Sequence, residues 1–365
     1  MKVLIVFNHP APYKINFFNE LSKHIDLDVI FERVKERDRS KLFYSEKKCD
    51  FNVISIKGIS FGNENYFSNG IIKHIKHNQY DLIIMNGYST LAEMKTIRYL
   101  NKHHIKYVLY INGGIINFNE PKWKKKLKTK YISSASYYFS PDKRSNDYLI
   151  YYGANPNNIL NYPYSTIHEK EILTNPLSIE EKKKRRIENG IECKNLFVSC
   201  GQLIKRKNYF ELIKVWKNID KDNLLIIIGD GKEENKYLKY IKDNDIKNVK
   251  ITGFLPRKQI FNLYQMSDVF VFSSNEDIYG HVINEALSQG LPVISTPNVN
   301  ASQHLIKDGI NGYIVNNIDS DDFRQKIKDV LLLDTYNECI KTAKENTYEL
   351  MAKQFIQMLE GVLKR

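Results

Sequence analysis

The feature that most constrains the fold is a strand, a loop, a helix and a second strand in succession between residues 268 and 295. Residues 268–272 form a short apolar run of the kind buried in parallel sheets, and residues 292–295 are predicted to form the next strand. Residues 281–287 have helical spacing, and Gly290 follows them where a left-handed cap favours glycine. The intervening loop therefore lies at the carboxyl end of a parallel strand, where open α/β sheets bind ligands.

Two acidic positions frame this unit. Asp277, with Glu276 beside it, lies in the loop, and Glu285 lies eight residues further on, inside the predicted helix. A carboxylate accepts hydrogen bonds from sugar hydroxyls, and the exposed amides of a helix start favour a phosphate nearby. A nucleotide-sugar would use both features. A solvated acid at a helix start is the commoner explanation for any single one of these residues, but the strand–loop–helix context favours a site.

At these residues the chain resembles the family 4 glycosyltransferases, which are retaining enzymes of the GT-B fold. The family signature is an acid, seven residues and a glutamate, with Phe/Tyr-Gly inside it and Glu-Ala at its end. The matching positions are Asp277, Tyr279, Gly280, Glu285 and Ala286, and residues 290–294 continue the motif. The resemblance implies that Glu276 or Asp277, with the backbone around Ile278, orients the donor sugar, and that Glu285 binds the ribose.

A second motif follows the strand predicted at residues 196–200. Gly201 leads into a loop that contains Arg206 and Lys207 and runs into a helix. Backbone amides and cations in this arrangement suit a diphosphate, although a solvated basic loop would look the same. In the family this place reads Gly-Arg-Leu, three residues, then Lys-Gly. Lys207 matches the phosphate-binding lysine, Gln202 holds the arginine position, and Arg206 is the natural substitute.

Two further turns match the family in the same order. Gly229 and Gly231 correspond to its Gly-x-Gly turn, and Phe254 and Leu255 belong to the loop whose backbone reads the base. Alone, each is an ordinary turn, but their order and spacing reinforce one another. The resemblance covers residues 195–316 well and the N-terminal half only as a general pattern.

The chain as a whole alternates strand-like and helix-like segments, which predicts parallel sheets with helices on both faces. Its 365 residues are too many for one ordinary core and indicate two domains. Turn signals dominate residues 154–194, and residues 66–77 are expected to be helical. We expect an α/β protein with an N-terminal domain over residues 1–164 and a C-terminal domain over residues 165–345. The resemblance implies a GT-B arrangement of two Rossmann-like domains facing a cleft, with residues 346–365 crossing back to the first.

Candidate acceptor-side residues follow strand ends in the N-terminal half. No Gly-x-Gly-x-x-Gly follows the first strand, which argues against a hydride-transfer dinucleotide site there. His9 lies in the loop after the first strand, where a histidine is more often only a hydrogen-bonding residue. Gly113 and Gly114 fit a plain turn equally well. Glu32 and one of the candidates, Glu120, are considered as acceptor-side bases. The candidates are His9, Tyr13, Asn112, Gly113, Gly114 and Glu120.

The net charge of +13 and the pI near 9.2 indicate an anionic partner, although genomic base composition can account for part of the lysine excess. No recognised nucleic-acid module is present, so no nucleic acid is expected as partner. The stretch from Lys122 to Lys130 combines six lysines with Trp123 and Leu127, which would share a helix face with Tyr131. It predicts either binding to an anionic membrane surface or a surface helix anchored on its own domain.

No apolar run approaches the roughly 18 to 20 residues of a membrane span, and the four cysteines have no metal-binding spacing. We therefore expect a cytoplasmic protein with reduced thiols, bound peripherally to the inner face of the membrane. No Asp-x-Asp metal motif occurs in the expected place, so neither a metal nor another cofactor is expected beside the donor.

The function predicted from the resemblance is transfer of a sugar, with retention, from a nucleotide-sugar donor. UDP-sugars are the commonest donors in the family, and a lipid-linked or glycan acceptor in bacterial cell-envelope polysaccharide synthesis is expected. One alternative is a nucleotide-sugar epimerase or sugar phosphorylase on the same fold. The other, from a different class, is a non-catalytic nucleic-acid-binding protein.

Overall fold

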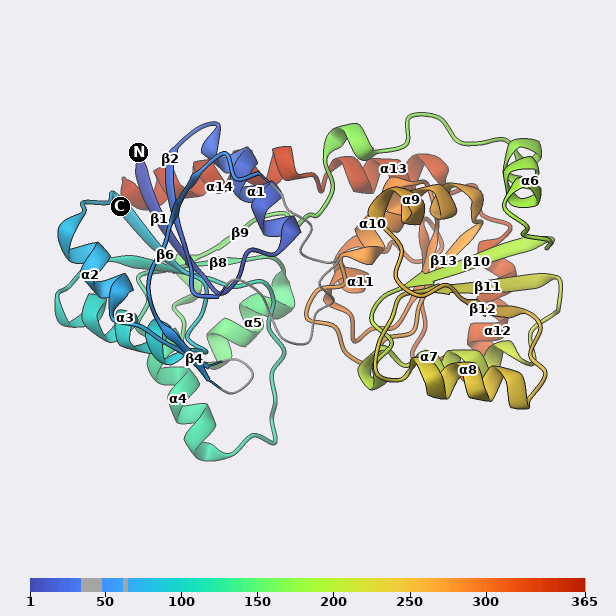
Figure 1. The fold of residues 1–365 in the computed structure, drawn as a ribbon, viewed down its shortest axis with the longest axis horizontal. Helices are drawn as coiled ribbons and strands as arrows, with labels where there is room; N and C mark the ends of the chain where they lie inside the picture. Colours follow the sequence, from blue (N-terminus) through green and yellow to red (C-terminus); the bar gives the residue numbers. More distant parts are fainter. Residues whose placement is uncertain (34–47, 62–64, 365) are drawn as a thin grey trace. The chain divides into compact units, whose positions relative to one another are not determined.

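The computed structural model describes residues 1–33, 48–61 and 65–364, and Figure 1 shows its fold. The chain forms two compact units. Unit 1 comprises Met1–Thr166 and Tyr348–Arg365, and unit 2 comprises Ile167–Thr347. The boundaries predicted from the sequence, after residues 164 and 345, lie close to these.

Unit 1 is built on a parallel sheet that has seven strands among the described residues, in the order β3-β2-β1-β6-β7-β8-β9. The strands in the middle of the sheet are buried on both faces, as their continuous apolar sequences predict. The strands are β1 (Lys2–Phe7), β2 (Asp26–Phe31), β3 (Asn52–Ile54), β6 (Leu82–Met85), β7 (Tyr107–Tyr110), β8 (Tyr137–Ser140) and β9 (Ile159–Asn161). The helices before residue 166 are α1 (Pro12–Ser22), α2 (Gly70–His77), α3 (Leu91–Lys102), α4 (Lys122–Ile132) and α5 (Lys143–Tyr151).

The last helix of the chain, α14 (Tyr348–Leu363), belongs to unit 1 and packs against α1. Phe355 is fully buried, and its ring centroid lies 5.2 Å from that of Phe17 and 4.8 Å from that of Phe139. Edge-to-face aromatic contacts of this kind add to the free energy of burial. The C-terminal segment thus completes the hydrophobic core of the N-terminal unit.

Unit 2 repeats the same design with a parallel sheet of six strands among the described residues, in the order β12-β11-β10-β13-β14-β15. The strands are β10 (Asn195–Cys200), β11 (Asn223–Ile228), β12 (Val249–Ile251), β13 (Val269–Phe272), β14 (Val293–Ser295) and β15 (Gly312–Ile314). The helices are α6 (Ile179–Glu188), α7 (Tyr209–Trp216), α8 (Glu234–Asp243), α9 (Arg257–Met266), α10 (Val282–Ser288), α11 (Asn300–Leu305), α12 (Asp321–Val330) and α13 (Tyr336–Lys344).

Two local predictions were wrong. The start of the segment expected to be helical, residues 66–77, lies in β5 (Asn65–Phe67), which pairs with β4 (Ile59–Phe61) in an antiparallel hairpin, and the helix begins only at Gly70. Residues 159–161, within the predicted turn region, form β9 and extend the sheet parallel to β8. Both are three-residue strands without a continuous buried apolar run, so the tertiary pairing decides their conformation.

Candidate active site

The residues predicted to bind the donor come together at one edge of the unit 2 sheet. Gly201 directly follows β10, Gly229 directly follows β11, and residues 273–281 follow β13. Because β11, β10 and β13 are neighbours and all parallel, their carboxyl ends meet at the same edge. This is the edge at which open α/β sheets bind ligands.

Two glycines, Gly229 and Gly231, allow the loops at this edge to come into backbone contact. A Cβ atom on Gly229 would lie 2.0 Å from the Gly201 carbonyl oxygen, and one on Gly231 would lie 2.5 Å from the Leu203 oxygen. The Gly229 amide also donates to the Gly253 carbonyl at 2.9 Å. A side chain at either position would push the loops apart, so the glycines allow the backbone approach that the site requires.

The basic loop is fastened to the loop that follows β13. Its single turn η4 (Lys205–Lys207) ends at Asn208, which has a left-handed φ of 59°. The Ser274 hydroxyl donates to the Arg206 carbonyl at 3.1 Å, and the Ser273 hydroxyl donates to the Lys207 carbonyl at 3.1 Å. The two cations therefore have a fixed backbone position beside the acidic loop.

Lys207 and Asp277 form an ion pair at the centre of the site, with side chains only 9% and 14% exposed. The Arg206 guanidinium lies 3.8 Å from the same Asp277 oxygen and donates to the Glu276 carbonyl at 3.1 Å. Burial opposes ionisation of Asp277, but Lys207 and Arg206 hold the pKa of its carboxyl below its usual value. Burial lowers the pKa of the Lys207 ammonium, and Asp277 opposes that shift.

The two candidate acids of the loop differ in environment. Asp277 is turned towards the cations, and it also accepts a hydrogen bond from the Tyr279 amide at 3.3 Å, whereas Glu276 is exposed. Ile278 is 53% exposed and Tyr279 is buried. Gly280 has a φ of 98°, and a Cβ there would lie 2.5 Å from Val299 Cγ1, so only glycine fits this turn.

Glu285 lies in the first turn of α10 and is part of a three-residue ion network that the sequence did not predict. Its carboxylate accepts from Arg257 Nη1 at 2.6 Å, and Arg257 Nε donates to Glu171 at 2.8 Å. Burial opposes ionisation of Glu171, but Arg257 holds the pKa of its carboxyl below its usual value. Burial, together with the nearby Glu285 charge, raises the pKa of the Cys200 thiol to about 12, so this residue stays protonated.

The remaining predicted donor residues lie around this network. Phe254, 37% exposed, and Leu255, half-buried, precede α9, which carries Arg257. Gln202, also half-buried, follows Gly201 at the end of β10. Asp230, between Gly229 and Gly231, has a backbone carbonyl that accepts from the Leu203 amide at 2.8 Å. The site thus combines a buried lysine, an exposed arginine beside it, a carboxylate held by a second arginine and a turn of close backbone contacts.

Among the candidates of unit 1, Asn112 belongs to a polar chain at the carboxyl edge of its sheet. Lys14, which is fully buried in α1, donates to Asn112 Oδ1 at 2.6 Å and to the Tyr110 hydroxyl at 2.5 Å. Asn112 in turn donates to Asn86 Oδ1 at 3.2 Å. Aromatic rings surround the Lys14 ammonium, including that of Tyr164 at 4.4 Å. Lys14 was not predicted, because a single lysine in an amphipathic helix gives no sequence signal.

The other unit 1 candidates occupy the loops around this chain. His9, which follows β1, is buried, and Tyr13 lies in the first turn of α1. Gly113 has a φ of 141°, and a Cβ on Gly114 would lie 2.5 Å from the Tyr148 ring. These glycines therefore have a structural reason to be present, in addition to any contact with an acceptor.

The two carboxylates considered as acceptor-side bases, Glu120 and Glu32, lie in different environments. Glu120 forms an ion pair with Lys128 of α4 at 2.8 Å and accepts a hydrogen bond from Tyr152, which directly follows α5, so these two residues hold it in place. Glu32 is buried and accepts a hydrogen bond from the Thr90 hydroxyl at 2.8 Å. Burial, followed by the charge of Glu93, raises the pKa of Glu32 to about 9. A raised pKa favours the protonated form of this carboxyl, which does not suit the role of a base, and that role stays a prediction.

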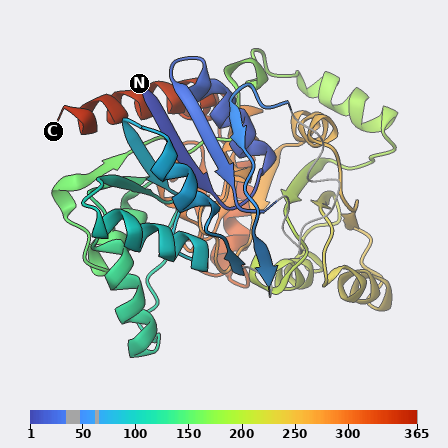
Figure 2. The ribbon, with the colours of Figure 1, turned by 60° about the vertical axis from the view of Figure 1, so that its left-hand side comes forward.

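The basic stretch from Lys122 to Lys130 forms most of α4, which extends away from the rest of its unit in both views (Figures 1 and 2). The expected shared apolar face is only partly available, because Tyr131 is buried and Leu127 is half-buried against the core. Trp123 is 64% exposed, and Phe118 just before the helix is 75% exposed. Across the described residues, no helix has both the length and the apolar character needed to cross a bilayer.

Solved structures define the class of the fold. A crystal structure of Anabaena HepE in complex with UDP aligns over 99% of this chain and 100% of its own, with a TM-score of 0.77 at 16% identity. The HepE complex with UDP-glucose aligns with a TM-score of 0.74 at 15% identity. The chain has the fold of the GT-B glycosyltransferases, as the sequence resemblance predicted.

Sequence comparison adds a family match. Residues 180–346, most of unit 2, match the model of the family described as Glycosyl transferases group 1. An uncharacterised glycosyltransferase of Methanocaldococcus jannaschii is 27% identical over 243 residues, which are 62% of this chain and 58% of the relative. The UDP-Gal:alpha-D-GlcNAc-diphosphoundecaprenol alpha-1,3-galactosyltransferase of Escherichia coli is 30% identical over 184 residues, 42% of this chain and 46% of the relative. These matches span about half the length of the relatives.

Proposed function

We propose that the protein is a retaining glycosyltransferase that uses a nucleotide-sugar, most simply a UDP-sugar, as donor. The observation that carries this proposal is the convergence of Lys207, Arg206 and Glu285 at the carboxyl edge of the unit 2 sheet. The HepE structures that share the fold contain UDP and UDP-glucose, and the E. coli relative is named for a UDP-galactose donor, which supports the choice of nucleotide.

Each element of the site has a proposed role. Lys207 and Arg206 bind the diphosphate, Glu285 accepts hydrogen bonds from the ribose, and Asp277 or Glu276 orients the donor sugar. The glycosidic bond to the nucleoside diphosphate breaks through an oxocarbenium-like transition state, and the cations and nearby backbone amides stabilise the charge that grows on the leaving phosphate. These groups take the place of a metal ion in the proposed reaction.

The proposed acceptor is a lipid-linked or other glycan of bacterial cell-envelope polysaccharide synthesis, bound mainly by unit 1. The E. coli relative and a Campylobacter jejuni relative are both named for acceptors on a diphospho-undecaprenol carrier. We propose that α4 brings the enzyme to the inner face of the membrane through its lysines and the exposed Trp123. A membrane-anchored acceptor would then be presented at the surface where the enzyme binds.

A thermal-shift screen of nucleoside diphosphates and their sugars, with and without EDTA, tests this proposal. A ligand that binds only the native state raises the melting temperature with its concentration. UDP and UDP-sugars are expected to raise it equally in chelator and in Mg²⁺. The proposal is contradicted if no nucleotide shifts the transition, and the metal-free arrangement is contradicted if the shift disappears in EDTA.

A further inference from the structure

A second concave site lies in unit 2, at the edge of the sheet opposite the candidate active site. Its floor includes Asn195, which begins β10, and two residues that directly precede strands, Asp268 before β13 and Pro292 before β14. The active-site loops follow the carboxyl ends of β10 and β13. Since these strands have six and four residues, about 13 to 20 Å of sheet separates the two sites.

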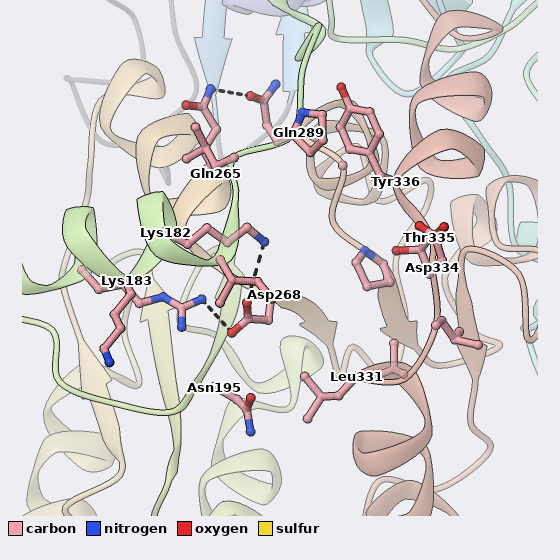
Figure 3. Close-up of a pocket in the computed structure, with 18 of the residues that line it drawn as sticks. Lys182, Lys183, Asn195, Gln265, Asp268, Gln289, Leu331, Asp334, Thr335 and Tyr336 are labelled. Carbon is pink, nitrogen blue, oxygen red and sulfur yellow. Dashed lines mark hydrogen bonds and ion pairs between the residues drawn. The ribbon is translucent and has the colours of Figure 1, made fainter.

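This cavity has a volume of about 790 Å³, within the range of small-molecule sites (Figure 3). Two lining residues bond to each other, with Gln265 Nε2 donating to Gln289 Oε1 at 2.9 Å. The Tyr336 hydroxyl donates to the Leu173 carbonyl at 2.9 Å, which fixes one wall. These bonds show that the cavity is bounded by ordered side chains from several elements.

The cavity is electropositive. Its lining has four cationic side chains and two carboxylates, Asp268 and Asp334. Arg186 is buried, and its guanidinium lies 2.7 Å from Asp268 and donates to two backbone carbonyls. The Leu196 amide donates to the same Asp268 Oδ2 that Arg186 contacts, whereas Asp268 Oδ1 faces the Lys182 ammonium at 3.7 Å, and Lys182 also donates to the Ser267 carbonyl at 2.8 Å. Burial lowers the pKa of Lys182, and a further anion nearby would oppose that shift.

The lysine side chains and the aliphatic part of the lining indicate which kind of ligand the cavity would bind. Arg186 and Lys182 are already paired with Asp268, which leaves the exposed Lys183 and Lys194 as point charges suited to a phosphate rather than to the planar pairing of arginine with a carboxylate. The wall beside them is aliphatic and includes Ile179, 82% exposed, and the half-buried Leu331. We propose that this cavity is a second binding site, separate from the active site, for a small phosphate ester that has an apolar body.

Calorimetric titration with hexyl phosphate tests this proposal. Inorganic phosphate and hexanol are titrated separately, because each represents one part of the ligand, the phosphate group and the apolar body. The expected result is saturable binding of hexyl phosphate at least tenfold tighter than either, unchanged by saturating UDP. Displacement by UDP would mean that the probe occupies the active site. Equal affinity for inorganic phosphate would mean that the aliphatic wall takes no part. Either result, or no saturable binding, overturns the proposal.

Variants at exposed lining positions locate the site. Lys183→Glu combined with Lys194→Glu should weaken hexyl phosphate binding at least tenfold, and Ile179→Asp should do the same by removing part of the aliphatic lining. Lys239→Glu, an exposed charge reversal on α8 outside the cavity, is the matched control and should leave binding within twofold of the parent. An equal loss in Lys239→Glu, or no loss in the lining variants, would show only diffuse attraction to a basic protein.

Discussion

The Lys207 ammonium lies directly against the Asp277 carboxylate, although seventy positions separate them in the sequence. Each comes from a loop at the carboxyl end of a parallel strand, and both side chains are largely buried. The pair neutralises the centre of the candidate site while no donor is bound. A diphosphate that enters the site would therefore compete with Asp277 for Lys207.

This relationship predicts separate effects on stability and binding. Lys207→Met leaves Asp277 buried without its main partner and should lower the free energy of unfolding by about 3 kcal/mol. Adding Asp277→Asn removes the stranded charge and should restore most of that loss. Neither variant should bind UDP as the parent does, since both lack the phosphate-binding cation. Urea unfolding and UDP titration measure the two effects, and parent-like UDP affinity in the double variant would rule out Lys207 as a phosphate ligand.

The glycine turns give a second prediction. Gly229→Ala places a Cβ where the Gly201 carbonyl already lies and should destabilise the protein by about 1 to 3 kcal/mol beyond the cost of the backbone conformation alone. Gly190 is the matched control, because it also has a positive φ of 66°, but no atom lies within 4 Å of the position that an added methyl group would take. Equal losses in Gly190→Ala and Gly229→Ala, measured by chemical denaturation, would mean that the close contact of the loops is unimportant.

The buried carboxyls of Glu32 and Glu93 in unit 1 predict how the stability of the protein changes with pH. The pKa of Glu32 is raised to about 9 in the folded protein, so the folded state holds a proton that the unfolded chain releases above its ordinary pKa of about 4.5. This contribution to stability is complete below pH 4.5 and is lost as the pH rises towards 9, at a limiting slope of about 1.4 kcal/mol per pH unit per proton. Glu32→Gln should therefore lose less stability than the parent between about pH 5 and pH 8. Urea unfolding at a series of pH values measures the free energy of unfolding of both proteins. If this free energy changes with pH in the same way in the parent and in Glu32→Gln, the raised pKa of Glu32 is contradicted.

Much of unit 2 could be predicted because its strands are continuous apolar runs and its turns carry glycines. The ion network around Glu285 could not, since Arg257 lies 28 residues from Glu285 and 86 from Glu171. Sheet topology brings these residues together, and periodicity carries no information about it. Glu171 was hidden further by its position in a segment that reads only as turns. In unit 1, burial determines the state of Glu32 and the environment of Lys14, and burial cannot be read from a single residue's neighbours in sequence.

Membrane binding through α4 is expected to depend on exposed residues only. Lys128 is paired with Glu120, and Lys125 donates to the Tyr151 hydroxyl, so the exposed Lys122, Lys124 and Lys126 should contribute most. Each is worth roughly 1 kcal/mol near an anionic surface before screening by salt. Changing these three to Glu should abolish sedimentation with anionic vesicles at low salt and leave UDP binding intact.

Two apolar residues of α4, the exposed Trp123 and the half-buried Leu127, supply a matched comparison for that experiment. Trp123→Ala should weaken vesicle binding, whereas Leu127→Ala should destabilise unit 1 instead, because Leu127 packs against the core. Equal sedimentation of the parent and the triple-Glu variant would mean that the lysines form only a solvated helix face.

The most direct test of the proposed donor site is a calorimetric titration with UDP in the presence of EDTA. UDP should bind one-to-one to the parent and at least tenfold more weakly to Glu285→Ala, because a charge-assisted hydrogen bond contributes about 1.5 to 3 kcal/mol. Arg257 keeps its pair with Glu171 in this variant, so the loss reports on the ribose contact. Glu211→Ala, at an exposed ion pair on α7, should bind like the parent. No binding by the parent, or equal affinity in Glu285→Ala, would contradict the central claim.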